Sequence, residues 1–209
     1  MKLTLSGTHK EIGQHIGQLY RSWGKKELYI PKISNDVYEQ QIAIYRQYFP
    51  RYLEWLEGIA MGAGFNRDDT VKSYTAGFLD LVSRPRSNCS VFGLHKNGEV
   101  YIGRDYDWRA ASEEISKQLS VQFTDRAYSF TALTDMGTWK MGAPGDQSSY
   151  VVVPEDAWNE HGLFVCINGA PGLSASTGMS CLHIVQAAIE QCKTTAEATE
   201  FITKVPCND

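Results

Sequence analysis

The dipeptide Asn97-Gly98 limits the folding of this chain more than any other local feature. It joins two runs rich in β-branched and aromatic residues, 89–95 and 100–104. Asn-Gly favours a two-residue type I′ turn, because both central residues of that turn take a positive φ. The two runs are therefore expected to form a β-hairpin, and the fixed turn length sets its pairing register. In that register Cys89 lies opposite Tyr106.

The predicted register brings three chemically distinct side chains to the open end of the hairpin. Arg104 is two residues from Tyr106, so we expect it on the same face as Cys89, as a diagonal neighbour about 7–8 Å away. Asp107 is expected beside the backbone nitrogen of Cys89. A guanidinium near a thiol favours the reactive thiolate. A carboxylate near an amine orients the amine and holds its proton.

A break in the chain immediately before Cys89 would complete a catalytic pair within one residue. The new α-amino group would have a pKa of about 7.7–8.0, which suits a general base at neutral pH. Nucleophile and base would then both belong to Cys89, a known way of activating a nucleophile. Spacing alone leaves an alternative open, in which Cys89 is an inert strand-edge cysteine and Arg104 and Asp107 form a surface ion pair.

The remaining cysteines are expected to be structural. The chain has five cysteines, an odd number, and no C-x-x-C pair, which argues against a disulfide framework and a structural zinc site. Cys166 lies in an apolar run and is expected to be buried, while Cys181 and Cys192 are expected to share the core face of a helix. A papain-like cysteine–histidine pair through His161 or His183 is a further alternative, although no local signature supports it.

Helical patterns occupy both sides of the strand-rich part. The Thr8–Glu11 segment has the form of a capping box, and Gly13 and Gly17 in the helix that follows predict close backbone packing. A second helical stretch covers residues 34–64, with a break at Pro50. Further helices are predicted over residues 66–82, 178–192 and 195–203, and strands over 89–95, 100–104, 118–123, 128–133, 149–153 and 163–167. Helices, then antiparallel strands, then helices are typical of an α+β layered fold.

Charge and hydropathy exclude several classes of function. The net charge is −4 and no run of Lys or Arg forms a basic stripe, so nucleic acid is a poor partner. Apolar stretches are too short to span a bilayer, and the first residues lack a signal-peptide pattern. We therefore expect a cytoplasmic protein without a membrane partner. A homo-oligomer is left open.

Four segments, taken together and in order, resemble the acyl-coenzyme A:6-aminopenicillanate acyltransferase-like family, whose members are related to the choloylglycine hydrolases. The segments are residues 7–17, 52–64, 88–92 and 103–108. The resemblance implies the αββα sandwich of N-terminal-nucleophile hydrolases. It implies that residues 1–88 form a helical N-terminal segment and that residues 89–209 begin the catalytic β-subunit. Family relatives have a longer second part, so the sandwich is expected to be incomplete at its C-terminal side.

The resemblance also implies roles for individual residues. The zymogen would cleave itself between Asn88 and Cys89, and Cys89 would become the N-terminal nucleophile. Arg104 would lie beside its thiolate, and Asp107 would bind the new α-amino group. Asn168, in a segment similar to the family's N-E-x-G-L motif and the strand after it, would help to build the oxyanion hole.

These roles lead to an expected activity. A self-processing cysteine enzyme would hydrolyse a small linear amide or transfer an acyl group from an acyl thioester. Neither a metal nor an organic cofactor is implied. The alternative from another class is a non-catalytic binding or structural protein that keeps the fold and never cleaves.

Overall fold

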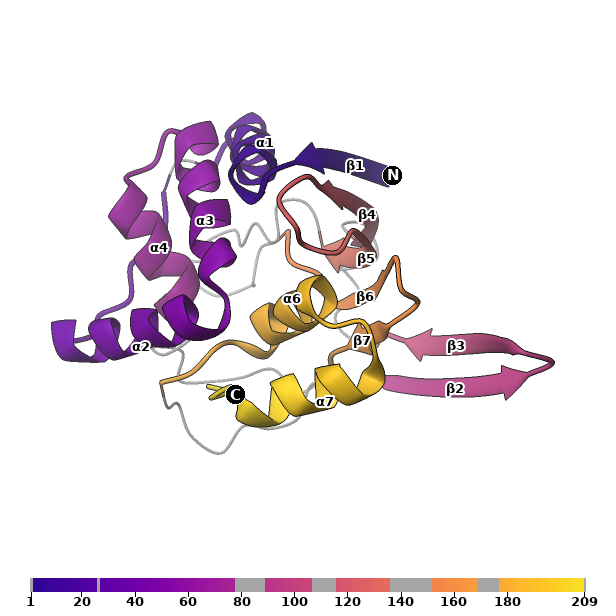
Figure 1. Cartoon of the computed structure of the whole chain (residues 1–209). Coiled ribbons are helices and arrows are strands. Elements are labelled where there is room, and N and C mark those ends of the chain that lie inside the picture. Colours follow the sequence, from indigo (N-terminus) through magenta and orange to yellow (C-terminus); the bar gives the residue numbers. More distant parts are fainter. Residues whose placement is uncertain are drawn as a thin grey trace.

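The computed structural model describes residues 2–25, 27–77, 89–106, 116–135, 152–168 and 177–208. In this part the chain is a mixed α+β fold, in which helices cover a five-stranded sheet and two further strands form a separate hairpin (Figure 1). The helices are α1 (His9–Ser22), α2 (Asn35–Tyr48), α3 (Pro50–Ala63), α4 (Arg67–Ala76), α6 (Cys181–Gln191) and α7 (Thr195–Lys204). The strands are β1 (Lys2–Gly7), β2 (Ser90–Lys96), β3 (Glu99–Asp105), β4 (Ser116–Phe123), β5 (Phe130–Asp135), β6 (Asp156–Asn159) and β7 (Phe164–Cys166).

Local signals set the ends of the first helices as predicted. Thr8 caps α1, and its backbone nitrogen donates to the carboxylate of Glu11 at 2.8 Å, which completes the capping box. Pro50 is the first residue of α3, where its missing N–H leaves no intrahelical bond unmade. Gly64 ends α3 in the left-handed conformation, with φ at 77°.

Glycines allow α1 and α3 to pack backbone against backbone. A Cβ added to Gly13 would lie 2.0 Å from the carbonyl oxygen of Trp55 on α3. In return, a Cβ added to Gly58 of α3 would lie 2.0 Å from the carbonyl oxygen of Lys10. Gly17 lies equally close to the α3 backbone, so the close packing predicted from the two α1 glycines is confirmed.

The five-stranded sheet has the order β1-β4-β5-β6-β7. Strand β1 is parallel to β4, and the other neighbours are antiparallel. The expectation that the first strand follows the helices, and that all strands are antiparallel, was therefore wrong. The strand that pairs with β1 comes more than a hundred residues later in the chain. No local sequence pattern therefore predicts this pairing. Of the strand expected over residues 149–153, residues 152 and 153 belong to no strand and the others lie outside the described part.

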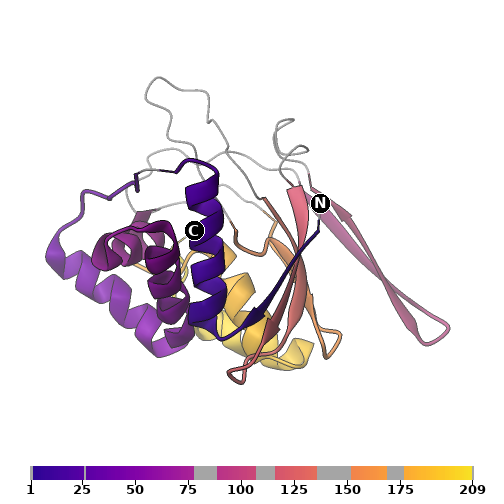
Figure 2. The ribbon, with the colours of Figure 1, turned by 90° about the horizontal axis from the view of Figure 1, so that it is seen from above.

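One face of the five-stranded sheet is buried and the other is partly open. Leu119 and Ala132 on the inner face are fully buried, in one core with Ile12 of α1. On the outer face, Leu133 is 40% exposed and Trp158 is 43% exposed. Figure 2 shows the helices on one side of this sheet and the β2–β3 hairpin on the other. The core thus joins residues from before and after position 88.

A buried histidine links three elements of this core. The Nδ1 atom of His9 lies 2.7 Å from the carboxylate of Asp125 in the β4–β5 connection, and its Nε2 atom lies 2.7 Å from the carboxylate of Glu190 on α6. Burial lowers the pKa of His9, but hydrogen bonds and charges from Glu190 and Asp125 outweigh burial and raise that pKa. The start of α1 is therefore tied to the sheet and to α6 by an imidazole held between two acids.

None of the helices in the described ranges is both long and apolar enough to cross a membrane.

The α1–α3 contact gives a prediction about stability. Gly58→Ala forces the two backbones apart and should lower the free energy of unfolding by about 1–3 kcal/mol, as over-packed cores do. Gly77→Ala is the matched control, because among the described residues a Cβ there meets only the ring of Tyr29, at 3.9 Å. Urea denaturation measures the free energy of unfolding of both variants. Equal values for the two would contradict the close packing of α1 and α3.

Candidate active site

The hairpin forms in the predicted register. Lys96 pairs with Glu99 at the turn, and Ser90 pairs with Asp105 at the open end. Both turn residues have positive φ, 55° and 82°, as a type I′ turn requires. Cys89 is the residue immediately before the first residue of β2. The prediction that the thiol lies at the open end of the hairpin is thus confirmed.

The guanidinium of Arg104 holds this end of the hairpin against the five-stranded sheet. Its Nε atom donates to Asp156 at 2.8 Å, and its Nη2 atom donates to the carbonyl oxygen of Ile167 at 2.7 Å. Its Nη1 atom donates within the hairpin, to the carbonyl oxygens of Asp105 at 2.6 Å and Ser90 at 3.3 Å. A planar group with five N–H donors can make such a set of bonds from one fixed position.

The Cys89 thiol lies beside the same side chain, close enough to raise its pKa. Burial lowers the pKa of Arg104, but bonding and charge from Asp156, and then from Cys89, raise it overall, so the group stays a cation. Cys89 itself is half-buried and therefore reachable from solvent. A fixed cation in contact with a thiol stabilises the thiolate, which is the nucleophilic form. The structure thus brings together Cys89 and Arg104, two of the residues singled out in the sequence.

Sequence reasoning missed Asp156. It lies 52 residues from Arg104 in the chain, and its side chain is 2% exposed. On the outer face of the sheet Asp156 pairs with Leu133 of β5 on one side and with Cys166 of β7 on the other. A four-residue strand carries too little pattern to be recognised, so nothing local marks this carboxylate as the partner of a hairpin arginine.

Cys166 was predicted to be buried, and this was wrong, because it is half-buried. It shares the sheet face of its neighbour Asp156, next to the Arg104 guanidinium rather than in the helical core. Burial, then the charge of Asp156, raise the pKa of the Cys166 thiol, while Arg104 acts in the opposite direction. Cys166 therefore ionises less readily than an ordinary cysteine thiol.

Behind the guanidinium lies a group of acids bridged by a tyrosine. The ring of Tyr106 lies 5.7 Å from the Arg104 guanidinium carbon, and its hydroxyl donates to Asp135 at 3.3 Å. Tyr106 is also hydrogen-bonded to Glu155. Burial, then the charge of Asp135, raise the pKa of Glu155 to about 8. Glu155 is thus largely neutral at pH 7, which limits the negative charge around the thiol.

Of the other predicted site residues, Asn168 is the one with a described position. Asp107 and Asn88 lie outside the described residues. Asn168 is exposed and directly follows Ile167, whose carbonyl oxygen accepts from Arg104. The backbone at Asn168 is therefore close to the guanidinium.

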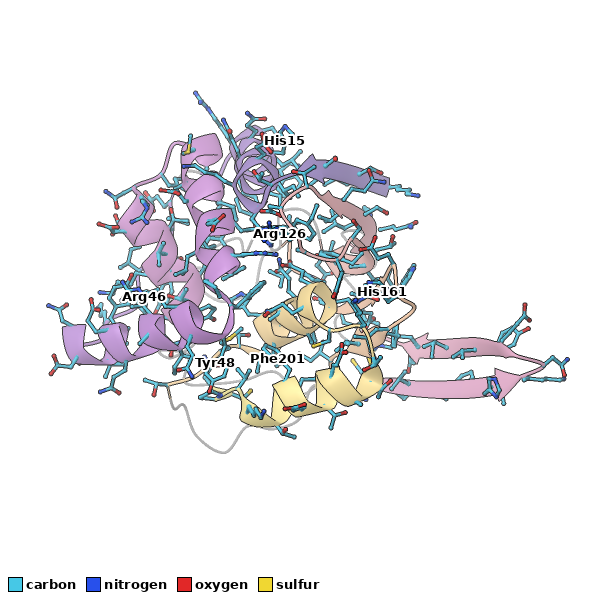
Figure 3. The ribbon with its side chains drawn as sticks, in the orientation of Figure 1. His15, Arg46, Tyr48, Arg126, His161 and Phe201 are labelled. Carbon is cyan, nitrogen blue, oxygen red and sulfur yellow. The ribbon has the colours of Figure 1, made fainter. Side chains whose placement is uncertain are left out.

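The two histidines considered as alternative bases have other surroundings. His183 is buried, with its ring nitrogens 2.6 Å and 2.7 Å from the hydroxyls of Tyr45 and Tyr52. Burial lowers its pKa to about 3. His161 lies in the β6–β7 turn against the ring of Tyr128, at the opposite end of these strands from Cys166 (Figure 3).

Among the residues with described positions, no group of three or more His, Cys, Asp or Glu side chains is arranged to hold a metal ion. A cavity of about 400 Å³ lies at the end of α3 and shares no residue with the Cys89 site.

Comparison of the chain with models of protein families finds no match, and comparison with curated proteins finds none either.

The buried ion pair gives a prediction about stability. Arg104→Gln leaves the carboxylate of Asp156 buried without its cation, and should lower the free energy of unfolding by about 3–5 kcal/mol. Arg67→Gln is the control, because Arg67 is 61% exposed where it pairs with Glu57, and its loss should change stability by less than about 1 kcal/mol. Urea denaturation measures the free energy of unfolding of the two variants. A similar small loss of stability in both would show that the Arg104–Asp156 pair does not anchor the hairpin.

Proposed function

We propose that this chain is a self-processing amide hydrolase of the N-terminal-nucleophile type, with Cys89 as its nucleophile. The observation that carries the proposal is the placement of Arg104 beside a solvent-reachable Cys89 at the open end of a hairpin. The resemblance of four segments to the acyl-coenzyme A:6-aminopenicillanate acyltransferase-like family supports the same reading. It assigns the nucleophile and the neighbouring arginine to these same two positions.

Self-processing is the first step of the proposed mechanism. The Cys89 sulfur attacks the carbonyl carbon of Asn88, and the Asn88–Cys89 peptide bond breaks as a thioester forms between the two residues. The proton of the thiol ends on the departing nitrogen, which becomes the α-amino group of Cys89. Water then hydrolyses the thioester, releasing the Asn88 carboxylate and restoring the thiol.

Turnover repeats this chemistry on a bound substrate. The α-amino group accepts the thiol proton, and the thiolate, stabilised by Arg104, attacks the substrate carbonyl. The leaving amine takes the proton back as the acyl thioester forms, and water then releases the acid. The proposal assigns Asp107 to hold the α-amino group. It assigns Asn168 to donate to the oxyanion, a contact worth about 3–4 kcal/mol in comparable sites.

The released acyl group can go to water or to an amine. Hydrolysis of a small linear amide is the first reading, and acyl transfer from an acyl thioester such as that of coenzyme A is the second. Neither route uses a metal or an organic cofactor. The Arg104–Cys89 pair serves both routes equally.

The proposal includes a finer architecture, the αββα sandwich. In it residues 1–88 are the N-terminal segment, and residues 89–209 begin the catalytic part. The β2–β3 hairpin would belong to the second sheet, facing the outer side of the five-stranded sheet. Its apolar side chains support this, because Phe92 is 66% exposed and Val100, on the opposite face, is 69% exposed. A two-stranded hairpin apolar on both faces is only marginally stable by itself in water.

Cysteine variants test the proposed nucleophile. A panel of chromogenic anilides of short and long acids should show turnover by the processed protein. Cys89→Ala should lower that rate by at least about 10³-fold, because it removes the attacking atom. Cys166→Ala is the matched control and should keep the rate within about threefold.

Turnover retained by the Cys89→Ala protein would contradict the assignment. If the Cys166→Ala protein lost turnover at the same time, Cys166 would be the nucleophile. Absence of turnover over a broad panel, with Cys89 unacylated by mass spectrometry, would favour a binding protein.

A further inference from the structure

We propose that Asp156 is a positioning residue that orients Arg104 toward Cys89 and moderates the positive charge which the thiol experiences. The inference deepens the proposed function, because it concerns the same nucleophile. No resemblance or motif in the sequence assigned a role to Asp156. The contacts around the Arg104 guanidinium carry the inference.

The first argument is geometric. Arg104 and Asp156 side chains are 8% and 2% exposed, and Nε lies 2.8 Å from the carboxylate oxygen. Among the described residues, the other oxygen acceptors of the guanidinium are the backbone carbonyls of Ser90, Asp105 and Ile167. Carbonyl oxygens direct the N–H groups but carry no net charge. Within this part of the chain, the carboxylate of Asp156 is thus the charged acceptor that fixes where the cation lies.

The second argument concerns charge. One guanidinium is bonded to a carboxylate and lies beside a thiol, so Asp156 and an ionised Cys89 share the same positive charge. The carboxylate also repels a thiolate directly, because both are anions near one cation. Asp156 therefore makes Cys89 harder to ionise than a lone arginine would. Asp156 also keeps Arg104 in the same position whether or not the Cys89 thiol is charged.

Other titratable groups surround the pair and must be considered together with Asp156. Cys166 of β7 lies beside Asp156, and Tyr106 lies over the guanidinium. Behind Tyr106 are Glu155 and Asp135. The buried Glu155 is largely neutral at pH 7, and Asp135 is bonded to Ser116 and Tyr106. Of these acids, Asp156 is the one in contact with Arg104, so its charge should dominate the effect at Cys89.

The experiment measures the rate of iodoacetamide alkylation at Cys89 against pH. Trypsin releases Cys89 in a peptide of residues 87–96 from the uncleaved chain, or 89–96 from the processed chain, and neither contains another cysteine. The two forms are therefore followed separately by mass spectrometry. Because the uncleaved chain can be measured, this test works even if self-processing and the proposed function fail.

Asp156→Asn keeps an oxygen that accepts from Nε and removes the charge. The alkylation midpoint should fall by about one pH unit. Well below the midpoint, alkylation should become about threefold faster, because a tenfold gain in thiolate is partly offset by lower nucleophilicity. Glu160→Gln is the control, since this acid of the β6–β7 turn is exposed. In this variant the alkylation midpoint of Cys89 should equal that of the wild-type protein. An unchanged midpoint in folded Asp156→Asn would overturn the proposal and leave Asp156 a structural residue.

A second measurement needs no substitution at Asp156. In the wild-type protein the Nε–H resonance of Arg104, followed by ¹⁵N NMR, should shift with the same midpoint as Cys89 alkylation. A resonance that stays constant across that midpoint would overturn the shared-charge account, even if Asp156→Asn fails to fold.

Discussion

The guanidinium of Arg104 is the interaction on which the site depends. It belongs to the hairpin by sequence, yet its bonds reach Asp156 of β6 and Ile167, the residue directly after β7. A lysine has the same charge but lacks a planar set of donors, and could not join these groups from one position. Because the bonds cross between two sheets, they fix both the open end of the hairpin and the thiol beside it. Structure and proposed chemistry therefore depend on the same side chain.

The rest of the fold supports that end of the hairpin from behind. The helical layer buries the inner face of the five-stranded sheet, and the reciprocal glycines bring α1 and α3 into backbone contact. His9 joins α1 to the β4–β5 connection and to α6. With its inner face packed in this way, the sheet presents Asp156 and Cys166 side by side on its outer face. A site placed on sheet strands that are packed from behind is better supported than one placed on loops.

Features that depend on short stretches of chain were predictable. The Asn97-Gly98 turn determined the hairpin register, and capping and proline signals located the first helices. These signals act over a few residues, so one sequence is enough to read them. The register in turn predicted that Arg104 lies near Cys89.

Features that depend on distant pairing were not predictable. The parallel pairing of β1 with β4, the short strand β6 and the half-exposed position of Cys166 all arise when separate segments meet. Asp156 is the clearest case, because an aspartate at the start of a four-residue strand looks like any loop acid. Its contact with Arg104 appears only when the open end of the hairpin meets the outer face of the sheet and a buried cation needs a counter-charge.

The central claim is that the hairpin end forms a nucleophile able to cut its own chain. The most direct measurement is the intact mass of the purified protein under denaturing conditions, after incubation at neutral pH. The account predicts two fragments, residues 1–88 and 89–209, with a new N-terminus at Cys89. A single full-length mass that persists through long incubation would contradict it.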